Sequence, residues 1–252
     1  MASQNVETPA KSAGRRRLLL ALGGLAAFYA GSRWWLTRPA PLNFQPAPGL
    51  PGFRRLVDGP VSQAAFDPLI GLDRRAEPLP EIGDDLKPLL FPGDAAGRVP
   101  VAYFADFRCP NCAELERLLR VHIEAGEIRL FRHEWPILGP ASVEAARAAL
   151  AAAMQGRAGA LDGGLTSSRL IVTAAYLRRI AGRAGLDAER LLADMRAPEV
   201  DAKLALVRAL ARRLGFYATP SMVMGRTLVI CQVPAPTLAA LVWARCCLVT
   251  SA

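Results

Sequence analysis

Two cysteines separated by two residues are the part of this sequence best suited to chemistry. They are Cys109 and Cys112, in the stretch FADFRCPNCAELERLL, where a short apolar run gives way to a helical pattern. Such a pair can be half of a metal site, a redox-active disulfide, a structural disulfide or two buried thiols. Its chemistry depends on the elements that hold the two sulfur atoms.

The pair lies where a strand is expected to end and a helix to begin. The run VPVAYFADF, from Val99, is apolar, of strand length and rich in residues that favour strands. Residues 113–125 then carry leucine and isoleucine at helical spacing, and Gly126 ends the pattern. Pro110 fits the first helical position, because an amide there has no partner within the helix.

This position favours disulfide exchange. A thiol at the beginning of a helix ionises more easily than a free cysteine, because it meets the positive end of the helix dipole and free amides. Cys109 occupies that position, and Arg108 beside it adds positive charge. Cys112, one turn later and facing inward, can attack a mixed disulfide formed at Cys109 and release the partner. We therefore expect a two-cysteine exchange centre that needs no cofactor.

The other cysteines and histidines do not complete a metal site. A zinc site would need two further ligands, and no second CxxC or HxxxH pair occurs among Cys231, Cys246, Cys247, His122 and His133. We expect no metal, and His133 is interpreted as a packing residue.

The three remaining cysteines are interpreted as follows. Cys231, on the last predicted strand, is expected to be a small buried hydrophobe. Cys246 and Cys247 are expected to be neutral or structural thiols, with a bridge from Cys231 to either of them, or a thiol relay, left open.

A second signal lies far downstream, in GFYATPSMVMGRTLVICQVPAPTLAALVWA. SMVM and TLVIC are typical of two short strands around Gly225-Arg226, and a final helix follows from about Pro236. Thr219-Pro220 stands directly before the first of these strands. A proline that opens a strand after a threonine is what a cis-proline loop beside a dithiol site would look like.

The order of these features resembles the DsbA-like branch of the thioredoxin superfamily, from Val99 to about Arg245. The order is strand, CPxC, helix, strand, long helical stretch, ATPS, hairpin and terminal helix. YFADFRCPNC is similar to the F-x-D-[YF]-x-C-x-x-C form, and residues 128–152 look like the family's second strand leading into its helical insertion. The resemblance implies an α/β thioredoxin fold with a helical insertion at about 140–214. The sequence of this insertion predicts helices at about 142–155, 168–183, 187–195 and 198–214, and AGALDGG breaks the first from the second.

The resemblance also implies roles for individual residues. Cys109 would be the nucleophile, Cys112 the resolving thiol, and Thr219-Pro220 the substrate-facing cis-proline pair. Exported proteins with cysteines would be the substrates, outside the cytoplasm.

Three positions bear on how the dithiol is tuned. Asn111 stands where many members carry histidine or tyrosine, and Tyr103 stands where an acidic residue often lies, six places before the first cysteine. Asp106 keeps the acid of the F-x-D form.

The N-terminus has the pattern of a membrane anchor or an export signal. Lys11 and an arginine cluster at 15–17 precede the apolar residues 18–36, which as a helix would span about 28 Å. Basic residues before an apolar run favour a cytoplasmic N-terminus, which places the rest of the chain on the far side of a bacterial inner membrane, in the periplasm. A cleaved secretory signal and a twin-arginine signal, which would give a soluble periplasmic protein, are the alternatives.

The expected organisation has four parts. Residues 1–36 form the tail and anchor, 37–97 a linker rich in proline and glycine with a helical turn around 84–90, 98–245 the DsbA-like domain, and 246–252 a tail.

Charge and composition narrow the function. The net charge is +9, and only three of the 31 basic residues are lysines. No basic strip with interleaved aromatic residues marks a nucleic-acid site. We expect a membrane-tethered oxidase of thiols in exported proteins, reoxidised by a membrane partner. The alternatives are a periplasmic reductase or isomerase, and a non-catalytic module that binds a metal or a partner.

Overall fold

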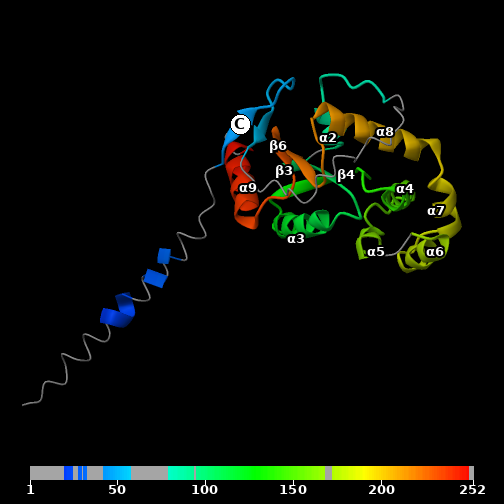
Figure 1. Ribbon diagram of the computed structural model, residues 1–252. Helices are drawn as coiled ribbons and strands as arrows, with labels where there is room; N and C mark the ends of the chain where they lie inside the picture. Colours follow the sequence, from blue (N-terminus) through cyan, green and yellow to red (C-terminus); the bar gives the residue numbers. More distant parts are fainter. Residues whose placement is uncertain are drawn as a thin grey trace, which may run out of the picture. The chain divides into compact units, whose positions relative to one another are not determined.

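The computed structural model describes residues 20–24, 28–29, 31–32, 42–57, 79–93, 95–167 and 172–249, the last five of these by backbone alone. The chain divides into two units, residues 1–40 and 41–252 (Figure 1). The described residues of the first unit are helical. None of the helices in the described ranges has both the length and the hydropathy that a membrane span requires. Most of the anchor expected at residues 18–36 lies outside the described residues.

The described part of the second unit is built on a six-stranded sheet with the order β1-β2-β6-β5-β3-β4. β3 pairs with β4 in parallel and with β5 antiparallel, and β5 and β6 form an antiparallel hairpin. The strands are β1 (Phe44–Pro46), β2 (Arg54–Leu56), β3 (Val99–Ala105), β4 (Ile128–Glu134), β5 (Ser221–Met224) and β6 (Thr227–Ile230). β3 lies between β5 and the edge strand β4, so strands flank its end, and the cysteine pair that follows, on both sides.

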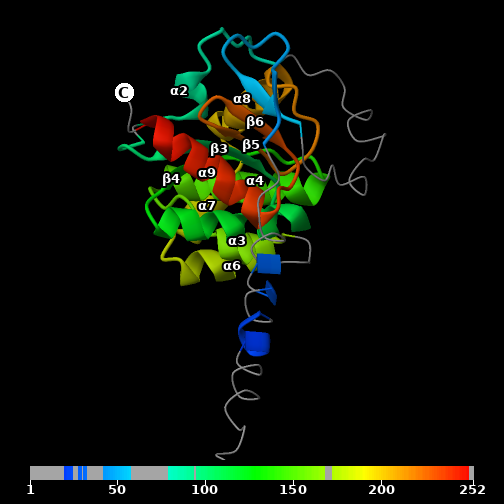
Figure 2. The same ribbon diagram turned by 90° about the vertical axis from the view of Figure 1, so that its left-hand side faces the viewer.

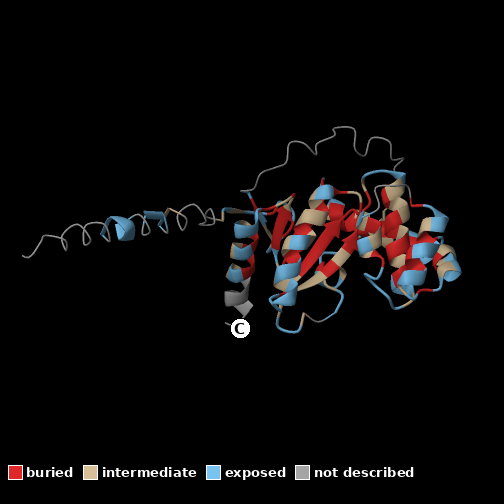
Figure 3. Cartoon of the chain, turned by 90° about the horizontal axis from the view of Figure 1, so that it is seen from below, coloured by how far each residue is buried: buried red, intermediate tan, exposed pale blue. Residues whose placement is uncertain are grey.

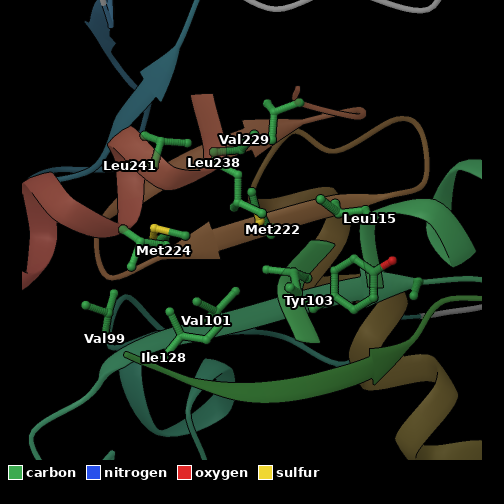
Figure 4. Close-up of a cluster of buried hydrophobic side chains, with 14 of the residues drawn as sticks. Val99, Val101, Tyr103, Leu115, Ile128, Met222, Met224, Val229, Leu238 and Leu241 are labelled. Atoms are coloured by element: carbon green, nitrogen blue, oxygen red, sulfur yellow. The ribbon is translucent and has the colours of Figure 1, made fainter. Parts of the chain in front are cut away.

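Helices cover both faces of this sheet (Figures 1 and 2). α3 (Pro110–Glu124) and α9 (Ala235–Val249) pack on one face, and α2 (Lys87–Leu90) and α8 (Pro198–Arg213) pack on the other. Alternation along β3 explains the two layers, because successive side chains of a strand point to opposite faces. Val101 and Tyr103 join the core under α3 and α9 (Figure 4). Ala102 and Phe104 join the core under α2 and α8.

The helical insertion between β4 and β5 has a core of its own. It contains α4 (Pro140–Met154), α5 (Asp162–Ser167), α6 (Ala174–Arg183) and α7 (Ala188–Asp194) before α8. Their buried faces turn toward one another (Figure 3), and alanines of α4 pack against leucines of the shorter helices. Phe107, just before the cysteine pair, belongs to this core. The insertion therefore packs against the loop that carries the dithiol.

The expected helices and strands of the domain are largely present, with one addition. The sequence predicted a break between the first two inserted helices, in AGALDGG, but α5 begins inside this stretch at Asp162. Leu165 of this one-and-a-half-turn helix is fully buried, so tertiary packing outweighs the two glycines. The helix expected over 168–183 is described from α6, where Thr173 caps Ala174–Arg183; residues 168–171 lie outside the described ranges.

The expected boundary at residue 98 needs correction, because the folded unit extends further toward the N-terminus. Residues predicted as linker form β1, β2 and α2, and β2 adds to the sheet by pairing in parallel with β6. Leu50, Leu86 and Leu90 are buried in the core under α8. The described parts of the 37–97 segment therefore belong to the domain.

Candidate active site

Cys109 lies at the N-cap of α3, as the sequence predicted. Its backbone is extended (φ −83°, ψ 115°), and Pro110 follows in the first helical turn. The amides of Cys112 and Ala113 donate to the Cys109 carbonyl at 3.1 and 3.3 Å. Both cysteines are buried, and both are free thiols in this structure.

The loop before β5 brings the other predicted pair to the same place. The Thr219-Pro220 peptide bond is cis, and the Cys109 thiol donates to the Thr219 carbonyl at 3.3 Å. The pairing of Phe104 with Ser221 places the end of β3 beside the beginning of β5, so residues 110 apart in sequence meet. The structure thus brings together all four residues that the sequence singled out.

Hydrogen bonds lower the pKa of Cys109 to about 7. The largest effect is a hydrogen bond from the Cys112 thiol, which outweighs the opposing effect of burial. The Thr219 side chain and the amides of Cys112 and Asn111 add to it. The expected helix-terminus effect is therefore present in the form of these amides, whereas the expected contribution of Arg108 is not among the main causes.

Cys112 behaves in the opposite way. Burial and the nearby Cys109 charge raise its pKa, so Cys112 holds its proton while Cys109 ionises. Tyr103, at the position where the family often has an acid, is fully buried and donates from its hydroxyl to the Cys112 carbonyl at 3.0 Å. Tyr103 therefore contacts the dithiol as a neutral hydrogen-bond donor.

Asp106 organises the loop that leads to the dithiol. Its carboxylate accepts from the Arg108 amide at 2.8 Å, and from the amides of Ile137 and Leu138 at 2.8 and 3.0 Å. The Cys109 amide donates to the Asp106 carbonyl at 3.1 Å. This acid thus ties the turn before Cys109 to the loop after β4.

The comparisons with known proteins identify the family. A family model described as Thioredoxin matches residues 87–242. The chain belongs to the thioredoxin family. It is accordingly a thiol-disulfide oxidoreductase.

Similar solved structures include a thioredoxin-like oxidoreductase from Silicibacter pomeroyi, at 40% identity with a TM-score of 0.54. The match covers 58% of this chain and 86% of that one. The thiol-disulfide exchange protein alpha-DsbA2 from Wolbachia pipientis is similar at 23% identity (TM-score 0.56), over 61% and 84% of the two chains.

A periplasmic thioredoxin-like protein from Salmonella enterica serovar Typhimurium is also similar, at 23% identity with a TM-score of 0.56. The match covers 67% of this chain and 99% of that one. No curated protein matches.

A buried charge cluster beside the dithiol is a feature that sequence reasoning missed. Arg132 of β4 forms ion pairs with Glu134, at 2.7 Å, and with Glu116 of α3. Its guanidinium lies 4.3 Å from the centre of the Phe107 ring. Burial raises the pKa of Glu134 to about 7, against the opposing effect of Arg132. Arg132 pairs with Tyr103 in the β3–β4 register, which brings the cluster near the dithiol.

The spacing of Glu116, four residues after Cys112 on α3, was the one signal of this cluster in the sequence.

His133 is a packing residue, as expected. It is 1% exposed, stacks on Phe104 with ring centres 4.8 Å apart, and its Nε2 lies 2.9 Å from the Leu90 carbonyl. Burial lowers the pKa of His133 to about 4, so the ring is neutral and joins α2 to the sheet.

Cys231 is buried as expected, and its pKa is raised by burial and by the charge of Cys109. The side chains of Cys246 and Cys247 lie outside the described part of the chain. Within the described residues, no group of three or more histidine, cysteine or acidic side chains could hold a metal ion.

Proposed function

We propose that this protein oxidises thiols in exported proteins through a Cys109–Cys112 disulfide. The observation that supports disulfide exchange at Cys109 is the asymmetry of the dithiol; the direction of exchange depends on which redox form is stabilised. Cys109 has a pKa of about 7 and is stabilised as a thiolate by several hydrogen bonds, whereas the pKa of Cys112 is raised. An acidic thiol leaves and exchanges readily, and a neutral partner keeps its proton until it is needed.

The reaction begins when a substrate thiolate attacks Sγ of Cys109. The Cys109–Cys112 bond breaks, and Cys112 leaves as a thiolate that takes up a proton. A second substrate thiolate then attacks the substrate sulfur of the mixed disulfide and releases Cys109 as a thiolate. Two substrate thiols are oxidised to one disulfide. The Cys109–Cys112 disulfide accepts the two electrons and becomes a dithiol.

Each of the four residues has a role in this scheme. Cys109 is the attacked sulfur and Cys112 is the leaving and resolving sulfur. Thr219, whose carbonyl already accepts the Cys109 thiol, and the adjacent Pro220 line the approach to Cys109 and would bind the substrate backbone. A membrane redox partner would remove the two electrons and restore the disulfide.

The direction of electron flow follows from which redox form is stabilised. The hydrogen bonds to Cys109 act on its thiolate, which exists only in the reduced form, so they make the disulfide more oxidising. We expect a reduction potential less negative than about −270 mV, the value for thioredoxin, and more negative than about −120 mV, the value for DsbA.

Equilibration with glutathione buffers, followed by mass spectrometry of acid-trapped thiols, measures this potential. A value at or below that of thioredoxin would overturn the oxidase proposal in favour of a reductase or isomerase.

An extracytoplasmic location is part of the proposal. The basic cluster at 15–17 before an apolar segment supports insertion with the domain outside the cytoplasm, and the related Salmonella protein is described as periplasmic. We propose that residues 18–36 tether the domain to the inner membrane.

A further inference from the structure

A third thiol lies beside the exchange centre. Cys231 directly follows β6, and Ile230 pairs with Ser221 in the antiparallel β5–β6 hairpin. Pro220 is the residue before Ser221, so Cys231 and Pro220 both adjoin the last pair at the same end of the hairpin. The neighbouring Thr219 carbonyl accepts the Cys109 thiol, so the hairpin leads Cys231 back toward Cys109.

The surroundings of Cys231 support this proximity. The side chain is 6% exposed, and its pKa is raised by burial and by the charge of Cys109. Tyr217, half exposed, shares a hydrogen bond with the Cys231 thiol. The buried Cys231 thiol thus has a half-exposed tyrosine as its partner.

The backbone of Cys231 is also unusual. Its φ is 71°, in the left-handed region where glycine is favoured and most other residues are strained. Such conformations cost on the order of 1 to 3 kcal/mol and recur at functional sites. A glycine would relieve this strain, so a thiol at this position has a cost that its packing alone does not explain.

We propose that Cys231 is a second resolving thiol of the exchange centre. The inference rests on the proposed function, because it acts on the mixed disulfide formed at Cys109. Cys231 loses its proton and attacks Sγ of Cys109; the bond between Cys109 and the substrate sulfur breaks, and the substrate leaves as a thiol. Cys231 is oxidised and the substrate sulfur is reduced, so no further oxidant is needed.

The resulting Cys109–Cys231 disulfide returns to the starting state by a second exchange. Cys112 attacks Sγ of Cys109, the bond to Cys231 breaks, and Cys231 regains its proton. Cys112 resolves faster in the intact protein, because its thiol already donates to Cys109. Cys231 therefore acts on mixed disulfides that Cys112 fails to resolve, and it limits the lifetime of blocked enzyme.

The decisive experiment compares Cys112→Ser with Cys112→Ser/Cys231→Ser in the full chain. Each variant is loaded with oxidised glutathione, and the adduct on Cys109 is followed by mass spectrometry of peptides. In Cys112→Ser the adduct should convert to a Cys109–Cys231 disulfide. In the double variant it should persist roughly tenfold longer or more.

Further variants make the outcomes distinguishable. Cys112→Ser/Cys246→Ser/Cys247→Ser should behave like Cys112→Ser. Cys112→Ser/Cys231→Ala should behave like Cys112→Ser/Cys231→Ser, because both variants lack the thiol at position 231. Cys112→Ser/Tyr217→Phe should slow the conversion, because the tyrosine hydrogen bond favours the Cys231 thiolate.

Equal adduct lifetimes with and without Cys231 would overturn the inference and leave the proposed function intact. A failure of glutathione to modify Cys109 in any variant would instead contradict the proposed function.

Discussion

At the scale of single residues, the acidity of Cys109 depends on its partner in the motif. The Cys112 thiol gives the largest of the effects that lower the pKa of Cys109 to about 7. Removing that donor with Cys112→Ala should raise the pKa of Cys109 toward that of an ordinary thiol. Cys112→Ser keeps a hydroxyl donor and should give an intermediate value.

The ultraviolet absorbance of the thiolate, followed against pH, measures both shifts, and the rate of iodoacetamide labelling at Cys109 provides a second readout. An unchanged midpoint in Cys112→Ala would show that the helix terminus alone sets the acidity of Cys109.

The residues of the site differ in how visible they are in the sequence. Cys109, Cys112 and Thr219-Pro220 could be predicted because each stands in a short local pattern. The cluster of Arg132 with Glu116 and Glu134 could not, because it forms only when β4 is placed in register with β3 and beside α3. The position of Cys231, next to the pair of Ile230 with Ser221, likewise depends on the register of the β5–β6 hairpin.

At the scale of elements, Asp106 joins the turn before α3 to the loop after β4. Asp106→Ala would leave three backbone amides without their acceptor, and unpaired buried donors cost about 1 to 3 kcal/mol each. Because water reaches part of this loop, we expect a total loss of about 2 to 4 kcal/mol in the free energy of unfolding. Urea denaturation measures the loss.

Asp84→Ala is the matched control for Asp106→Ala. It removes a carboxylate that is 99% exposed and paired with Arg213, so it should change stability little. A loss as small for Asp106→Ala as for Asp84→Ala would refute the bridging role of Asp106.

The sequence predicted helices and strands correctly where the apolar periodicity is strong. It missed strands that form only through pairing in the folded sheet. The spacing of apolar residues located β3, α3, α8 and α9 to within a few residues. β1 and β2 are only three residues long and stand in a stretch rich in proline and glycine, so neither composition nor alternation indicated strands. Their pairing with each other and with β6 is what makes them strands.

His133 makes the attachment of α2 sensitive to acid. Burial lowers the pKa of His133 to about 4, whereas an unfolded histidine titrates at about 6.5. Between these values the unfolded chain binds a proton that the folded chain does not, so this residue's contribution to stability falls as the pH is lowered. The full loss is about 3 kcal/mol.

Glu134 acts in the opposite sense over an overlapping range. Its folded pKa is raised to about 7, so the folded chain holds a proton that the unfolded chain releases, and stability falls as the pH rises toward 7. The test for His133 is therefore the difference between the wild type and His133→Gln, measured by urea denaturation from pH 7 to pH 4. This difference should change with pH, and a constant difference would exclude a buried neutral histidine.

At the scale of the whole molecule, the open question is where the domain resides. The dithiol can act as an oxidant only where an oxidising partner keeps it as a disulfide, which favours the periplasm over the cytoplasm. The basic cluster at 15–17 and the tryptophans at 34 and 35 predict an N-terminus inside, an anchor through the inner membrane and the domain outside. The proposed oxidase chemistry and the N-terminal pattern therefore favour the same compartment.

Two measurements on the full chain test this arrangement. A reporter that is active only outside the cytoplasm, fused after Ala252, should be active, and the protein should remain in the membrane fraction after a high-salt or carbonate wash. Replacing the three arginines at 15–17 by glutamines should reduce reporter activity, because the charge bias that orients the anchor is weakened. Complete recovery in the soluble periplasmic fraction, with cleavage near residue 30, would replace the anchor by a signal peptide and leave the exchange chemistry unchanged.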